Sequence, residues 1–184
     1  MKTIVFFLEE PSAQRMLEGV LPRFIPDVNV RYVVFQGKSD LEKELVRKLR
    51  LWQLPDSVFV VMRDKDAGDC RAIKMRLAEL CRKAGQCEAL IRVACHELES
   101  FYLGDLAAVE RGLDLTGLAA KQVKSQYKNP DRLGNPSEIL SKLTNGKYQK
   151  EAGSRAIGKY LNLENNSSQS FTVLLSGIKK VLEP

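Results

Sequence analysis

The chain has 184 residues, of which 44% are hydrophobic and 28% are charged, and its formal net charge is +6. These proportions are typical of a globular protein with a substantial core, and the mild positive charge suits a polyanionic partner. No stretch approaches the roughly 20 apolar residues that a membrane-spanning helix needs, so we expect a soluble, cytoplasmic protein without a membrane partner. The four cysteines form no C-x-x-C pair, which argues against a zinc site and favours reduced thiols.

Apolar and amphipathic segments alternate along the chain up to residue 105. The continuous apolar runs predict buried strands at 2–8, 28–35, 58–62 and 88–94. Between them, apolar residues recur every three or four positions and predict helices at about 12–21, 39–52 and 69–84. This order predicts an α/β fold, Rossmann-like, with a mostly parallel four-stranded sheet flanked by helices.

Acidic residues stand where these strands end. They are Glu9 after the first strand, Asp64 and Asp66 after the third, and Glu97 and Glu99 after the fourth. Parallel strands joined by right-handed crossovers all end at the same edge of the sheet, where ligands of such folds bind. We therefore expect these five side chains to gather on one rim.

The stretch at 56–69, DSVFVVMRDKDAGD, is the strongest of these signals. Residues two apart on an extended segment point the same way, so Asp64 and Asp66 are expected to aim two carboxylates at one point. A divalent cation with oxygen ligands would relieve their repulsion. The alternative is a solvated acidic turn in which Arg63 and Lys65 act as local counterions. Asp69 is expected to cap the helix that follows.

Residues 106–184 differ in character from the preceding part. They contain no strong strand candidate and predict short helices joined by loops, ending in an amphipathic helix at 171–182. Between 121 and 160 there are nine basic and three acidic residues. The seven bases that we expect to contact nucleic acid are Lys121, Lys124, Lys128, Arg132, Lys147, Lys150 and Arg155. We therefore predict an α/β domain at 1–105 with a basic helical extension at 106–184 packed on it.

The order of the acidic motifs resembles the Toprim domain of topoisomerases, primases and OLD-family nucleases. Here it reads Leu8-Glu9-Glu10 after the first strand and Asp64-Lys65-Asp66 after the third. The resemblance covers about residues 2–105 and implies that Glu9, Asp64 and Asp66 form a catalytic Mg²⁺ (or Mn²⁺) site that acts on nucleic-acid phosphodiesters. Toprim domains usually have Gly where this chain has Glu10, which either contributes to the site or alters the approach of the phosphate.

Later motifs look like the DUF4276 family, a Toprim-like group often associated with ATPase partners. They are ELESFYLGD at 97–105, Asn135-Pro136, and SQSF at 168–171. This resemblance spans nearly the whole chain and implies a phage-defence type of system with an ATPase partner protein. Glu97 and Glu99 would then be further metal ligands or structural partners of nearby bases.

Two functions follow as expectations. The first is metal-dependent cleavage or nicking of DNA or RNA, with Glu9 as general acid or base and the basic extension holding the polyanion. The second is a non-catalytic interaction or regulatory subunit of an ATPase complex, docking through exposed apolar residues near Phe101-Tyr102 or on the last helix. Nucleotide binding lacks support, because neither G-x-x-x-x-G-K-[ST] nor G-x-G-x-x-G occurs.

Overall fold

The computed structural model describes residues 2–183. Within that range four strands form one sheet in the order β2-β1-β3-β4, and every pairing is parallel. The strands are β1 (Thr3–Leu8), β2 (Asn29–Val34), β3 (Ser57–Asp64) and β4 (Leu90–Ala94). The α/β fold with a parallel sheet, expected from the alternation of apolar runs and helical patterns, is confirmed.

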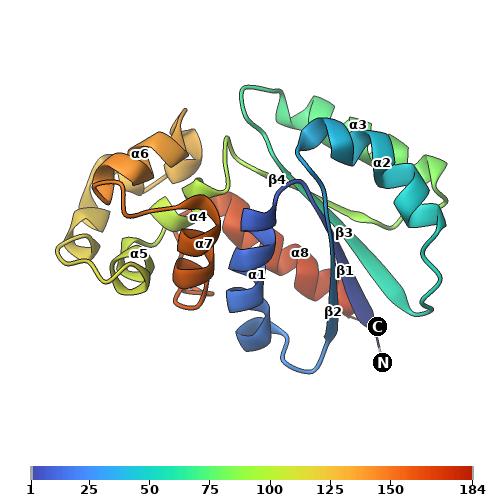
Figure 1. The fold of residues 1–184 in the computed structure, drawn as a ribbon, viewed down its shortest axis with the longest axis horizontal. Coiled ribbons are helices and arrows are strands. Elements are labelled where there is room, and N and C mark those ends of the chain that lie inside the picture. The colour runs from blue at the N-terminus through green and yellow to red at the C-terminus, as the bar shows by residue number, and fades with distance from the viewer. Residues whose placement is uncertain (1, 184) are drawn as a thin grey trace.

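Helices cover both faces of this sheet (Figure 1). Helices α2 (Lys38–Arg50) and α3 (Cys70–Lys83) lie on one face, while α1 (Pro11–Phe24) and α8 (Gln169–Leu182) lie on the other. Helix α2 ends two residues earlier than expected. Trp52 therefore lies outside it, yet its ring still packs against Phe7 and Phe59.

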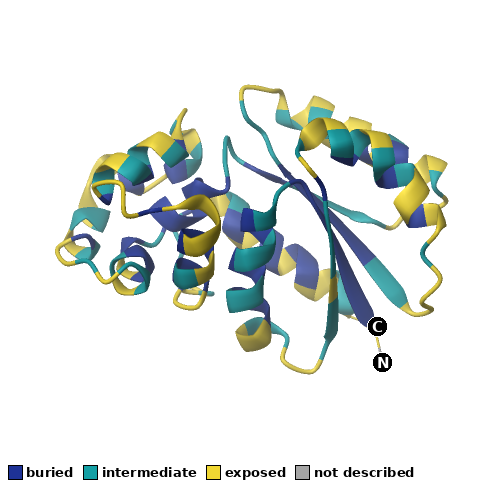
Figure 2. Ribbon diagram, viewed as in Figure 1, coloured by how far each residue is buried: buried dark blue, intermediate teal, exposed yellow. Residues whose placement is uncertain are grey.

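Strand β1 is the centre of the core and is buried along its whole length (Figure 2). Because successive side chains of a strand point to opposite faces, Ile4, Phe6 and Leu8 join one hydrophobic cluster while Val5 and Phe7 join the other. A strand that is covered on both faces needs apolar residues at every position, which is why this segment shows no alternation with polar residues.

The chain after β4 is helical within the described residues, as expected. It forms α4 (Glu99–Leu103), α5 (Leu106–Gly112), three 3₁₀ turns, α6 (Pro136–Leu143), α7 (Lys150–Gly158) and α8. The turns are η1 (Ala119–Val123), η2 (Ser125–Tyr127) and η3 (Pro130–Arg132). Helices α4 to α7 lie beside the end of the sheet from which α1 starts (Figure 1).

Two glycines bring the helical part close to the α/β part. A Cβ on Gly19 of α1 would lie 2.6 Å from the backbone of Gly158 of α7, so the two helices approach at a distance that only glycine permits. The first hydrophobic cluster also runs through both parts, since it includes Leu140, Ile157 and Phe171 together with the residues of β1. The two parts therefore share one core.

The sequence also led to expectations about membrane-spanning helices and about the cysteines. Among residues 2–183, no helix is both long and apolar enough to cross a membrane. All four cysteines are free thiols.

Candidate active site

Glu9 and Asp64 meet where the order of the sheet reverses. The chain runs outward from β1 to β2, then returns to β3 on the other side of β1, so the ends of β1 and β3 flank the switch point at which such folds bind ligands. The backbone N–H of Asp64 donates a hydrogen bond of 3.0 Å to Oε2 of Glu9. Glu9 itself is only 8% exposed. The fold thus buries an acidic side chain at its expected ligand site.

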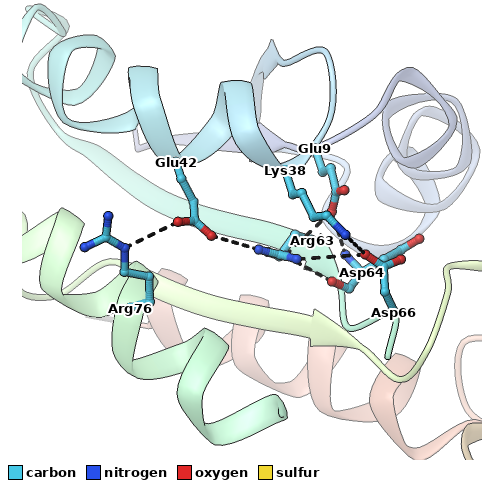
Figure 3. A network of polar contacts seen from close by, with 7 residues as sticks. All are labelled: Glu9, Lys38, Glu42, Arg63, Asp64, Asp66 and Arg76. Carbon is cyan, nitrogen blue, oxygen red and sulfur yellow. Dashed lines mark hydrogen bonds and ion pairs between the residues drawn. The ribbon is translucent and has the colours of Figure 1, made fainter. Parts of the chain in front are cut away.

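Arg63 supplies a buried positive charge to this place. Its side chain is 7% exposed, and its Nε lies 3.8 Å from Oε2 of Glu9. Its Nη1 donates to Glu42 of α2 at 3.0 Å, and Glu42 in turn pairs with Arg76 of α3 (Figure 3). A buried charge is tolerated only when it is paired, so this network accounts for the burial of both Arg63 and Glu9.

Asp66 lies beyond the end of β3, whereas the sequence predicted an extended segment there. Strand β3 ends at Asp64, and Asp66 adopts a left-handed backbone conformation with φ of 51°. Its N–H donates to the carbonyl of His96, and Gly68 then closes a turn onto Lys65. The expectation of an extended segment that continues through Asp66 is therefore wrong.

The carboxylate of Asp66 has cations beside it. Lys38, the first residue of α2, lies 2.8 Å from its Oδ2, and Nη2 of Arg63 lies 4.0 Å away (Figure 3). The positive charge expected near the D-x-D carboxylates is thus present as side chains from β3 and α2. The pairing of Lys38 with Asp66 could not be predicted from the sequence, because the two residues are 28 positions apart.

Glu99 comes from the helix that follows β4. It begins α4, is completely buried, and its Oε1 accepts a hydrogen bond of 2.7 Å from the hydroxyl of Tyr148. Its second oxygen, Oε2, is buried without any hydrogen-bond partner among the described residues. Buried carboxylate oxygens normally have partners, so this atom calls for an explanation.

Glu97 has a different role. Its Oε2 accepts a hydrogen bond of 2.7 Å from the backbone N–H of Ser137, in the first turn of α6. A carboxylate is favourable at the N-terminus of a helix, where backbone N–H groups lack partners. Glu97 therefore has a structural role, but its partner is a backbone N–H and not one of the nearby basic residues that the sequence suggested as an alternative. Asp69 caps α3 as expected, accepting a hydrogen bond of 2.8 Å from Ala72.

Three carboxyl groups of the site have raised pKa values. Burial is the main cause for Glu9, Asp64 and Glu99. The pKa of Asp64 is raised well above its ordinary value, and the negative charges of Glu99 and Glu9 add to the effect of burial. The backbone N–H of Asp64 and the charge of Arg63 act in the opposite direction on the pKa of Glu9. The site thus gathers acids whose negative charges disfavour the ionised form of Asp64.

Glu10 connects the site to the helical part. It stands at the N-cap position of α1, and its Oε2 lies 2.7 Å from Nζ of Lys150, the first residue of α7. Glu10 also lines a small cavity, of about 10 Å³, together with Glu9, Asp64 and Leu98. A volume of that order holds about one water-sized particle. Glu10 thus faces the site.

The chemistry of these donors suits a divalent cation, although no set of three or more His, Cys, Asp or Glu side chains in residues 2–183 is already arranged to hold one. Carboxylate oxygens are the ligands that Mg²⁺ and Mn²⁺ prefer. The unpartnered Oε2 of Glu99 and the repulsion between Asp64, Glu99 and Glu9 are what a cation would relieve. The carboxylates of Glu9, Asp64 and Glu99 would hold the cation, and Asp66 would join them once its ion pair with Lys38 opens.

The expected nucleic-acid-binding residues are spread over the helical part. Lys150 is the one of them that an ion pair joins to the acidic site, through Glu10. Most of the others are exposed: Lys124 and Lys128 flank η2, Arg132 ends η3, Lys147 precedes α7 and Arg155 lies on α7, whereas Lys121 in η1 is half-buried. Among the tyrosines of this basic region, Tyr127 and Tyr148 are buried, whereas Tyr160 is exposed and lies beneath Arg111.

Fold and site together define an α/β protein with an all-parallel sheet. Acidic side chains lie at its switch point, and one of them, Glu9, pairs with Arg63. The chain belongs to the DUF4276 family, described as a domain of unknown function, whose model matches residues 8–179. No curated protein matches the chain significantly. No solved structure does so either.

Proposed function

We propose that this protein is a Toprim-like, metal-dependent phosphoryl-transfer enzyme that cleaves or nicks nucleic acid. One observation carries the proposal: the carboxylate of Glu9 accepts a hydrogen bond from the backbone N–H of Asp64, 55 residues away in sequence, at the topological switch point of the sheet. Asp66 and Glu99 lie near enough for their charges to act on Glu9 and Asp64, respectively.

The roles of the residues follow from their surroundings. When bound, Mg²⁺ or Mn²⁺ would polarise a phosphoryl oxygen and lower the pKa of water. Asp64 and Glu99 would hold the cation through their carboxylate oxygens. Glu9, whose pKa burial raises above its ordinary value, would hold it or serve as general base, with Arg63 fixing its orientation.

Lys150 is the basic residue best placed to bind the substrate at the site. It already contacts one carboxylate, Glu10, and the charges of Glu99 and Asp64 also act on it. A substrate phosphate bound at the metal would compete with the Glu10 carboxylate for the ammonium group of Lys150. The more distant bases, Lys124 and Lys128 among them, would hold the flanking polyanion.

Cleavage assays on two substrates test this proposal. Supercoiled plasmid and single-stranded RNA are incubated with the full chain in Mg²⁺, Mn²⁺ or EDTA. We expect metal-dependent nicking or cleavage, reduced by at least about a hundredfold in Glu9→Gln and Asp64→Asn. Asp27→Asn, which removes an exposed carboxylate between α1 and β2, serves as the matched control. Equal activity in Asp64→Asn and wild type, or activity that persists in EDTA, would refute the proposal.

A second candidate is a non-catalytic subunit of an ATPase complex. It is favoured by the ion pairs of the rim, since Glu9, Asp66 and Glu10 all pair with cations of the chain itself. The docking face expected near Phe101-Tyr102 is excluded, because both rings are buried, at 1% and 0% exposed. On the last helix, the other place expected for docking, Val173 is exposed, and exposed apolar side chains also lie beside α2 and on α3, at Leu51 and Met75. Co-elution with an ATPase partner that Met75→Lys abolishes, without any cleavage activity, would favour this candidate.

A further inference from the structure

Tyr148 links the helical part of the chain to the acidic site. It lies in the loop between α6 and α7, is 6% exposed, and donates its hydroxyl to Oε1 of Glu99 at 2.7 Å. The hydrogen bond gives it a further role, because its acceptor is one of the acids that act electrostatically on Asp64.

The ring of Tyr148 is fixed from several directions. Its backbone N–H donates to Oγ1 of the buried Thr144 at 3.2 Å. Its ring packs on that of Tyr102, with centroids 5.9 Å apart. The ring also lies against Gly153. A Cβ at position 153 would lie 2.4 Å from the Tyr148 ring, so any residue other than glycine there would force the ring to shift. The hydroxyl is therefore held at one place.

This arrangement leaves one oxygen of Glu99 free. Tyr148 occupies Oε1, while Oε2 is buried with no partner in the described chain. Burying a carboxylate oxygen without a partner costs free energy. A bound ligand from outside the chain would remove this cost by interacting with the oxygen. Residues that hydrogen-bond a metal ligand typically fix its orientation in this way.

We propose that Tyr148 is a positioning residue that holds Glu99 so that its Oε2 is presented to the divalent cation at Glu9 and Asp64. This inference rests on the proposed function, since it names a residue that shapes the same metal site. It also gives the helical part a role in the chemistry, because the loop before α7 sets the orientation of a ligand next to β3.

Manganese binding to the full chain tests this without any measurement of cleavage. Free Mn²⁺ is measured by electron paramagnetic resonance as MnCl₂ is added to wild type, Tyr148→Phe, Tyr102→Phe, Glu99→Gln and the double variant Tyr148→Phe/Glu99→Gln. Tyr102→Phe is the matched control, because the Tyr102 hydroxyl is buried beside Tyr148 yet has no hydrogen-bond partner in the described residues. Circular dichroism checks that each variant is folded.

We expect Tyr148→Phe to weaken Mn²⁺ binding by about tenfold or more, as removal of a partner of a metal ligand typically does. Tyr102→Phe should bind as wild type, and the double variant should bind no more weakly than Glu99→Gln alone. Equal losses in the two tyrosine variants, or unchanged binding in Tyr148→Phe, would overturn the inference. Absence of Mn²⁺ binding by wild type would overturn it together with the proposed function. Normal Mn²⁺ binding by a chain that cleaves nothing would overturn only the proposed function.

Discussion

The guanidinium of Arg63 lies 3.8 Å from the carboxylate of Glu9, and both side chains are almost completely buried. Neither charge would be stable there alone, since removing an ionised group from water costs several kcal/mol. The pair lies at the ends of β3 and β1, the two central strands. Arg63 thus allows the fold to keep an acid at its switch point.

Replacing Arg63 by methionine should therefore destabilise the protein substantially. The change keeps much of the apolar stem but leaves Glu9 buried without its cation, so we expect a loss of about 3 kcal/mol in the free energy of unfolding. Urea denaturation at neutral pH measures it. Arg76→Met is the control: Arg76 pairs with the same Glu42 but is 53% exposed, and its loss should stay below about 1 kcal/mol. Similar losses in both variants would contradict this account of Arg63.

The buried acids make a distinct prediction about pH. The pKa values of Glu9, Asp64 and Glu99 are higher in the folded chain than their ordinary values of 4.5, 3.8 and 4.5. The folded state therefore binds more protons than the unfolded state. The resulting stabilisation is present below the ordinary pKa values and is lost as the pH rises through the folded ones.

Asp64→Asn should consequently raise the melting temperature in metal-free buffer at pH 8, by a few degrees, because it removes a carboxyl group whose ionised form is disfavoured by burial and by the charges of Glu99 and Glu9. The gain should shrink toward pH 4, close to the ordinary pKa of 3.8, because the carboxyl of the unfolded chain also takes up a proton there. Differential scanning calorimetry at the two pH values measures both. Asp27→Asn should change neither. A lower melting temperature for Asp64→Asn at pH 8 would mean that the ionised carboxylate stabilises the fold.

The fold could be predicted because its signals are local. An unbroken apolar run such as Ile4–Leu8 has few interpretations other than a strand buried on both faces, and helices between such strands imply parallel neighbours. Parallel strands share one end, which is why an acid after β1 and another after β3 could be expected together. The hydrogen bond between Glu9 and Asp64 follows from the same geometry.

The partners of the site residues could not be predicted in this way. The pairs Lys38–Asp66, Tyr148–Glu99 and Lys150–Glu10 join residues 28, 49 and 140 positions apart. Each depends on how one helix packs against the edge of the sheet, and no periodicity encodes that. Nor could spacing distinguish Glu97 from Glu99, which are two residues apart, although one caps α6 and the other is buried beside Tyr148.

The SQSF run at 168–171 should contribute to stability rather than to substrate binding. Oγ of the buried Ser168 accepts from the N–H of Phe171 at 3.3 Å and donates to Asp131 at 2.6 Å, and Asp131 also accepts from the N–H of Ser170. Ser168 is thus the N-cap of α8. Ser168→Ala should cost about 1–2 kcal/mol in chemical denaturation. Ser176→Ala, on the exposed face of α8, should cost less than about 0.5 kcal/mol. Equal effects would mean that the cap is not what stabilises the helix.

The basic helical part should show itself in the salt dependence of nucleic-acid binding. Lys124 and Lys128 are exposed on either side of η2, with no ion pair in the described residues. If both contact phosphates of a duplex, Lys124→Gln/Lys128→Gln should reduce the slope of log K against log[salt] by about 1.8 in magnitude. Fluorescence anisotropy with labelled DNA from 50 to 200 mM KCl, a range over which such contacts weaken strongly, measures the slope. Lys43→Gln/Lys48→Gln, with the same change in net charge on the exposed side of α2, should leave it unchanged. Equal reductions in both variants would show that net charge, and not a surface on the helical part, determines the binding.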